Sequence, residues 1–137
     1  MASPTRWPYA ALVGLACSMR STVGPAALAA RGRFTGKQRV AVLLAAVGEF
    51  AADKHPNVPA RTEPPVLGGR IVSGAYCGFV VAGPTGLVVA AASAAVGTHA
   101  TERARKVVGE KTGWPDPAVA VGEDLLAVAT ATLATRR

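Results

Sequence analysis

Seven ionisable side chains lie inside or beside the apolar stretches of this 137-residue chain, where a charge is costly to keep. They are Arg20, Glu49, Asp53, Lys54, Arg70, Glu123 and Asp124. A charged side chain near the centre of a bilayer costs at least about 2.5–3.5 kcal/mol on insertion scales. Such groups must therefore pair with one another, line water or lie close to an interface.

Two chemical roles are open for this set of charges. In the first, Arg20 and Arg70 each neutralise a carboxylate on a neighbouring helix and hold a helical bundle together. In the second, Glu49 or Glu123 cycles between a charged and a neutral state, in a site that handles protons or cations. Glu123 and Asp124 are adjacent on one helix and point about 100° apart, so at most one of them faces a given partner squarely.

A short sequence repeat contains two of the carboxylates, Glu49 and Glu123. The tetrad Ala-Val-Gly-Glu at 46–49 recurs at 120–123, and in both places it follows apolar residues and precedes another acid. A degenerate duplication would leave this pattern, and transporters built from such repeats carry their site at the repeat interface.

The elements that must position these residues are predicted from the spacing of the charges. No Asp, Glu, Lys or Arg occurs from Ile71 to Thr101, whereas one bilayer crossing needs only about 20 apolar residues. The tetrapeptide 83–86, Gly-Pro-Thr-Gly, is a strong turn signal within that run. We therefore expect two helices, at 66–82 and 85–108, joined by a tight turn.

Shorter apolar runs predict three further helical segments, at 8–30, 38–54 and 117–135, with connections at 31–37, 55–65 and 109–116. Arg20 and the Val-Gly-Pro sequence at 23–25 interrupt the first segment, which is therefore the candidate for a re-entrant segment. The sequence thus predicts a single all-α membrane domain over 1–137, a small polytopic protein with four to five transmembrane or re-entrant segments.

Composition leaves two classes of protein. The chain is 50% hydrophobic, with a mean hydropathy of +0.31, and its 15 basic and eight acidic residues give a net charge of +7. Two cysteines are too few for a disulfide scaffold, a zinc ribbon or an iron–sulfur fold. A small membrane protein and a basic, Ala-rich soluble bundle remain. A soluble surface helix keeps a polar face, and the run 71–101 has none beyond Ser, Thr and Gly, which favours the membrane.

Small and aromatic residues support the membrane interpretation. Gly74 and Gly78 form a small-xxx-small pattern of the kind that lets helices pack closely in lipid. Trp7, Tyr9 and Trp114 are the expected interface anchors.

The basic clusters at 31–39 and 103–111 are expected to bind anionic lipid head groups, because they carry almost no aromatic residues that could stack on nucleic-acid bases. If all five segments cross the membrane, six basic residues fall on one side and seven on the other, so charge alone does not predict orientation. Dual topology or a re-entrant segment would explain this balance.

No phosphate loop, dinucleotide fingerprint, zinc-protease motif or Gly-x-Ser-x-Gly sequence is present. We therefore expect a protein that is not an enzyme, with no catalytic residue, no metal site and no cofactor.

Four stretches resemble a family of small bacterial multi-pass membrane proteins known as domain of unknown function 4126. They are 14–28 (GLACSMRSTVGPAAL), 47–56 (VGEFAADKHP), the Pro-Pro and Gly-Gly pairs at 64–65 and 68–69, and 113–129 (GWPDPAVAVGEDLLAVA). The resemblance covers most of the chain and implies a membrane protein without an established activity. It singles out six of the seven charges, all except Arg70, and it supplies no substrate. His55 departs from the family pattern, in which an apolar residue more often follows Asp-Lys.

The sequence therefore predicts an integral plasma-membrane protein, in which intramembrane carboxylates paired with arginines serve transport of an ion or solute. A homo-oligomer is expected, because five short helices enclose little volume. One alternative is a structural or assembly subunit that packs through Gly/Ala faces. Another is a soluble basic helical protein that binds nucleic acid. If the chain is instead a membrane protein, nucleic acid is not expected as a partner.

Overall fold

The computed structural model describes residues 6–52 and 64–136. They form five α-helices and no strand: α1 (Trp7–Met19), α2 (Val23–Ala30), α3 (Gly36–Ala52), α4 (Pro64–Thr112) and α5 (Asp116–Ala134). The all-α prediction is confirmed. Asp53 and Lys54, together with 55–63 of the connection predicted at 55–65, lie outside the described residues, and α4 already begins at Pro64.

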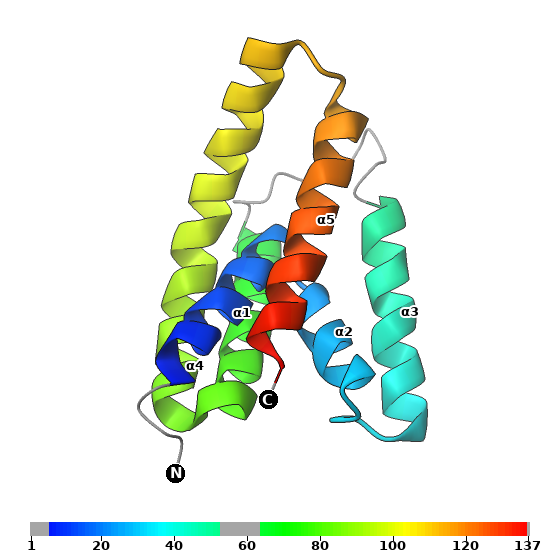
Figure 1. Cartoon of the computed structure of the whole chain (residues 1–137), viewed down its shortest axis with the longest axis vertical. Coiled ribbons are helices and arrows are strands. Elements are labelled where there is room, and N and C mark those ends of the chain that lie inside the picture. The colour runs from blue at the N-terminus through cyan, green and yellow to red at the C-terminus, as the bar shows by residue number, and fades with distance from the viewer. Residues whose placement is uncertain (1–5, 53–63, 137) are drawn as a thin grey trace.

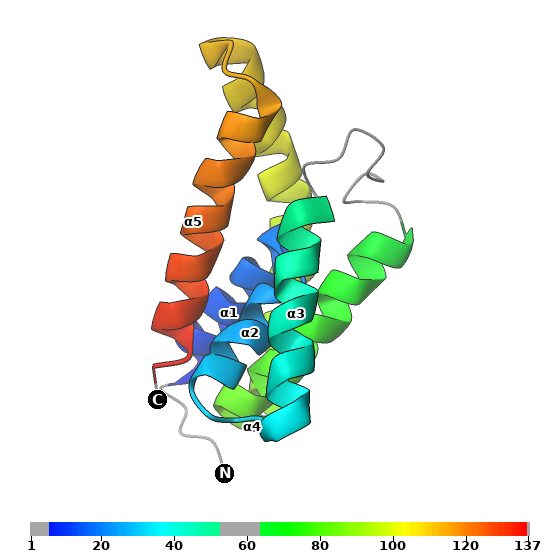
Figure 2. The ribbon, with the colours of Figure 1, turned by 90° about the vertical axis from the view of Figure 1, so that its right-hand side faces the viewer.

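The predicted segment 8–30 is two helices. Arg20 ends α1 in an extended conformation (φ −143°, ψ 118°), and α2 begins at Val23. In Figures 1 and 2, α1 rises to the middle of the bundle and α2 returns to the end from which α1 started. The two helices form a hairpin with its apex at 20–22. The break predicted at 23–25 was placed too late, because Pro25 lies in the first turn of α2, where its missing N–H removes no intrahelical bond.

Helix α4 folds back on itself at a single bend. Ala82 (φ −142°) and Gly83 (φ 70°, ψ −158°) are non-helical, and Pro84 follows them. The positive φ at position 83 suits glycine. The bend separates a first arm, 64–82, from a second arm, 84–112, which correspond to the two helices predicted there. The second arm continues to Thr112, so the predicted connection at 109–116 was too long and residues 113–115 alone join α4 to α5.

Small residues bring the two arms and α1 into close contact. A Cβ atom on Gly78 would collide with the carbonyl oxygen of Gly86 and the Cβ of Ala90, and one on Gly74 would lie 2.9 Å from the Cβ of Ala94. Gly14 of α1 lies against the backbone of Ala90 in the same way. Helix α1 packs most extensively against α4 and next against α5. In the core, the backbones of α1 and of the two arms of α4 therefore approach closely, which only small residues allow.

A charged side chain lies in the interior of the bundle, while many large apolar side chains lie on its surface. Among the described residues, the largest fully buried side chain is that of Arg20, followed by Val13, Thr98 and Cys17. Large apolar side chains lie on the outside of the helices instead, and the exposed fraction reaches 66% for Leu44 and 70% for Val96. In a water-soluble protein, a buried charge and a broad exposed apolar surface both require an explanation.

Among the described residues, one end of the bundle carries basic side chains and no acidic one. The start of α1, the α2–α3 connection, the bend of α4 and the end of α5 all meet there (Figure 1). Arg6 donates to the carbonyl of Val81 beside the bend (3.5 Å), and Arg31 donates to that of Thr132 (3.4 Å). We name this the basic end; its cations are Arg6, Arg31, Arg33, Lys37, Arg39 and Arg136.

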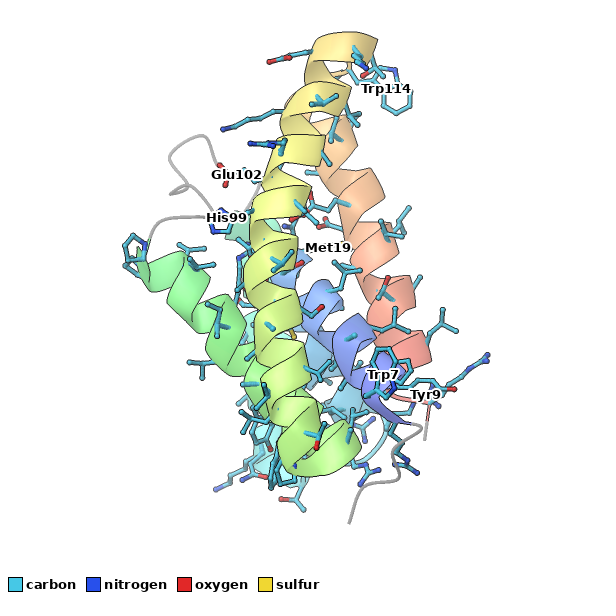
Figure 3. All side chains as sticks on the ribbon, turned by 90° about the vertical axis from the view of Figure 1, so that its left-hand side faces the viewer. Trp7, Tyr9, Met19, His99, Glu102 and Trp114 are labelled. Carbon is cyan, nitrogen blue, oxygen red and sulfur yellow. The ribbon has the colours of Figure 1, made fainter. Side chains whose placement is uncertain are left out.

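Aromatic residues mark the two ends of the bundle. Figure 3 shows Trp7 and Tyr9 toward the basic end and Trp114 at the opposite end. All three are exposed, as expected for interface anchors. By length and composition, α4 is the one helix in the described ranges that could cross a membrane, and α1 is apolar but shorter.

The close approach of the two arms of α4 predicts a strong size limit at position 78. We expect Gly78→Ala to lower the free energy of unfolding by about 1–3 kcal/mol, because the added methyl group must push the arms apart. Gly109→Ala, in the same helix but in open space, should be neutral or stabilise by up to about 1 kcal/mol. Thermal unfolding followed by circular dichroism in mild detergent measures both changes. Equal stability of the two variants would contradict this packing.

Candidate functional site

The buried guanidinium of Arg20 lies at the apex of the α1–α2 hairpin and faces two carboxylates of α5. Its Nη1 is 3.7 Å from Oε1 of Glu123, and its Nη2 forms an ion pair with Oδ1 of Asp124. The side chain of Arg20 is 1% exposed, and those of Glu123 and Asp124 are 10% and 16% exposed. One cation therefore shares a nearly dry site with two anions, and it fixes the apex to the middle of α5.

A second arginine reaches the same apex from the first arm of α4. Arg70 donates through Nη1 to the carbonyl oxygen of Ser18, and Arg20 donates to that of Met19 at 2.9 Å. Both carbonyls belong to the last turn of α1, where the helix itself supplies no N–H partner. Cations are also favoured there by the negative end of the helix dipole. The two buried guanidinium groups thus supply hydrogen-bond donors to the last carbonyl groups of α1, in place of water.

The third carboxylate approaches from α3. The hydroxyl of Ser21 donates to Oε2 of Glu49, and the hydroxyl of Ser73 in α4 donates to the carbonyl of Ser21. The thiol of Cys17 is 3.7 Å from the Ser73 hydroxyl oxygen. Ser21 is therefore held by α3 and α4, whereas its neighbour Arg20 is held by α5.

The two Ala-Val-Gly-Glu tetrads show the same pattern of buried and exposed residues. Ala46 and Ala120 are buried, Val47 and Val121 are exposed, and Glu49 and Glu123 are half-buried. The two glutamates contact successive residues of the apex, since Glu49 bonds to residue 21 and Glu123 faces residue 20. Helices α3 and α5 thus present the same short sequence to the hairpin.

The structure brings five of the seven predicted charges to one region: Arg20, Glu49, Arg70, Glu123 and Asp124. Their neighbours Ser18, Ser21 and Ser73 were missed by the sequence reasoning. The signal for Ser21 was available, because Arg-Ser-Thr at 20–22 is a polar tripeptide within an apolar segment. The described residues contain no cluster of three or more His, Cys, Asp or Glu that could hold a metal ion.

The charge site lies near the middle of the bundle. At 1.5 Å per helical residue, Asp124 is about 12 Å along α5 from its first residue, Asp116, and about 15 Å from its last, Ala134. Met19, beside Arg20, is likewise at mid-height in Figure 3. In a bilayer with a hydrocarbon core of about 30 Å, this site would lie close to the centre.

The ion pairs of Arg20 predict a strong effect of removing one partner. We expect Asp124→Asn to destabilise the protein by about 3–5 kcal/mol, because a buried guanidinium loses a counter-charge. Glu102→Gln is the matched control, since Glu102 pairs at 3.6 Å with a Lys106 side chain that is 71% exposed. Its effect should stay below about 1 kcal/mol. Thermal unfolding in detergent compares the two, and similar shifts would show that the Arg20 pair contributes no more than a surface pair.

No protein-family model, no curated protein and no solved structure was found to match the chain. The family resemblance expected from the sequence therefore stays a prediction, and the argument for function rests on the geometry of the site.

Proposed function

We propose that the chain is an integral plasma-membrane protein that transports a small ion or solute through a site at the apex of the α1–α2 hairpin. The observation that carries this proposal is the fully buried, ion-paired Arg20, at mid-height in a bundle whose large apolar side chains face outward. Lipid would accept that exterior, and an interior of Ala and Gly suits helix packing in lipid.

In this arrangement α4, the described helix that is long and apolar enough to span a bilayer, crosses with its two arms. Helices α3 and α5 do not meet that measure on their own and cross packed against the rest of the bundle, and α1 and α2 enter and leave on one side. The 17 residues of α3 and the 19 of α5 are about 26 Å and about 29 Å long, which is close to the thickness of the hydrocarbon core. The non-helical backbone at 20–22 is tolerable at that depth because protein groups satisfy it.

Helices broken near the bilayer centre are a recurring way of building transport sites, because the break frees backbone groups and helix ends for a ligand. Here the break gathers two arginines, three carboxylates and two serine hydroxyls. The single chain encloses little volume and exposes apolar side chains on all sides, so a homo-oligomer within the bilayer accompanies the proposal.

The two alternative functions have less support. Gly74 and Gly78 pack against the second arm of α4, so the small-residue face expected for a structural subunit is occupied within the chain. A soluble nucleic-acid binder would expose residues such as Leu44 and Val96 to water.

Fractionation and reconstitution test the function. The protein should stay in the membrane pellet after a carbonate wash and leave it only with detergent. Purified and reconstituted into vesicles, it should carry H⁺, Na⁺ or K⁺ faster than protein-free vesicles, read by ion-sensitive dyes inside them. Release by carbonate would contradict the membrane location. Retention in the pellet without any flux would favour the structural subunit.

The re-entrant hairpin also predicts orientation. With α1 and α2 on one side, the start of α1 and the end of α5 both lie at the basic end. The described residues of that end include no acid, which suits the anionic cytoplasmic leaflet. A reporter after α5 that is active only in the cytoplasm should be active, and the same reporter within 113–115 should be silent. An export-dependent reporter should give the reverse pattern. Equal activity at both positions would indicate dual topology and contradict this orientation.

A further inference from the structure

We propose that Glu49, rather than Glu123 or Asp124, is the carboxylate that binds and releases the transported ion, and that this ion is a proton. The inference rests on the proposed transport function and assigns its site and its substrate. Three observations carry it: the partners of each carboxylate, the buried oxygen atoms beside Glu49, and the packing of α3.

The partners separate the three carboxylates. Glu123 and Asp124 both face the guanidinium of Arg20, which is fully buried. If either of them took up a proton, a buried cation would lose part of its compensation, which is strongly unfavourable. These two carboxylates are therefore suited to a permanent charge.

Glu49 faces a neutral partner. Its Oε2 accepts a hydrogen bond from the hydroxyl of Ser21, and its Oε1 is buried without a hydrogen-bond partner among the described residues. Protonation of Oε1 turns this acceptor into a donor and breaks no ion pair of the described chain. A buried carboxylate oxygen without a donor is costly to keep, and a proton is the smallest ligand that it can take up.

Within 6–52 and 64–136, the charged and titratable groups around Glu49 are few. Helix α2, against which α3 chiefly packs, carries no titratable side chain. Arg20 precedes Ser21 and faces α5, and the thiol of Cys17 lies beyond Ser73. Arg70 donates to the carbonyl of Ser18. Glu49 is thus the carboxylate that approaches the apex from the side opposite to α5.

A proton fits this site better than a metal ion. One carboxylate supplies one negative charge, and a single proton neutralises it without a shell of further ligands. Glu49 accepts a hydrogen bond from the Ser21 hydroxyl, and in the next residue Oγ1 of Thr22 is also buried without a hydrogen-bond partner among the described residues. The transfer is simple: the carboxylate takes a proton from hydronium on one side of the membrane and returns it to water on the other, and no other bond changes.

Helix α3 is also the element best placed to move. In the described part of the chain it packs chiefly against α2, whereas α1, α4 and α5 contact one another. A small displacement of α3 separates Glu49 from Ser21 and leaves the ion pairs of Arg20 intact. Such a step exposes the carboxyl group in turn to either side of the apex.

The experiment uses the full chain in vesicles with a pH-sensitive dye inside, driven by a pH gradient. Glu49→Gln should keep the elution profile and melting temperature of the parent protein and lose proton flux at least tenfold. Glu102→Gln, a carboxylate on the second arm, should keep the flux. Glu49→Asp and Ser21→Ala should retain flux with a shifted pH profile, and they replace Glu49→Gln if that variant does not fold.

Infrared difference spectra between acid and alkaline conditions provide a readout independent of transport. The parent protein should show a protonated-carboxyl band that is absent from Glu49→Gln, beside the bands that the other seven acidic residues contribute to both spectra.

Proton flux that survives in Glu49→Gln would overturn the assignment and leave the transport function standing. Loss of Na⁺ flux in the variant, with no proton flux in the parent, would overturn the identity of the ion. If the parent carries no ion, the transport function fails. The infrared band then still decides whether Glu49 binds a proton, and its presence in Glu49→Gln overturns that part as well.

Discussion

The fold depends on one buried cation. The Arg20 guanidinium is fully enclosed, and an enclosed cation is stable only if counter-charges and acceptors surround it. This requirement places the middle of α5 beside the hairpin apex, because Glu123 and Asp124 supply the negative charge. It also accounts for the end of α1 at this point, since the carbonyl of Met19 becomes an acceptor for Arg20 where the helix stops.

The interior of small residues follows from the same requirement. Polar groups within the bundle need short distances to their partners, and only backbones that approach closely provide them. Glycines at 14, 74 and 78 allow α1 and the two arms of α4 to meet almost without intervening side chains. The large apolar residues are then left for the outside, where the proposed lipid environment accepts them. The buried charges and the exposed large side chains thus follow from the same close packing of backbones.

Much of the helix pattern could be predicted from the sequence, because charge-free runs and a Gly-Pro turn are local signals. The clustering of Arg20 with Glu123 and Asp124 was within reach, since buried charges must find opposite charges. The contact of Arg70 with the Ser18 carbonyl was not, because nothing in residue spacing reveals a backbone acceptor on another helix. The direction of α2 was equally hidden: Pro25 marks a break nearby, but whether the chain continues across or turns back depends on packing against α1 and α4.

The small residues at the centre have a consequence for how this sequence can evolve. Alanine and glycine at positions such as 14, 78, 86 and 90 have almost no smaller replacement, so nearly every mutation there adds volume to a filled space. On the outer surface, by contrast, one aliphatic residue can replace another with little effect. Within the bundle, selection would therefore act on the size of side chains, and on the outer surface it would act on their polarity. Related chains would preserve the spacing of their smallest residues while the rest of the sequence diverges.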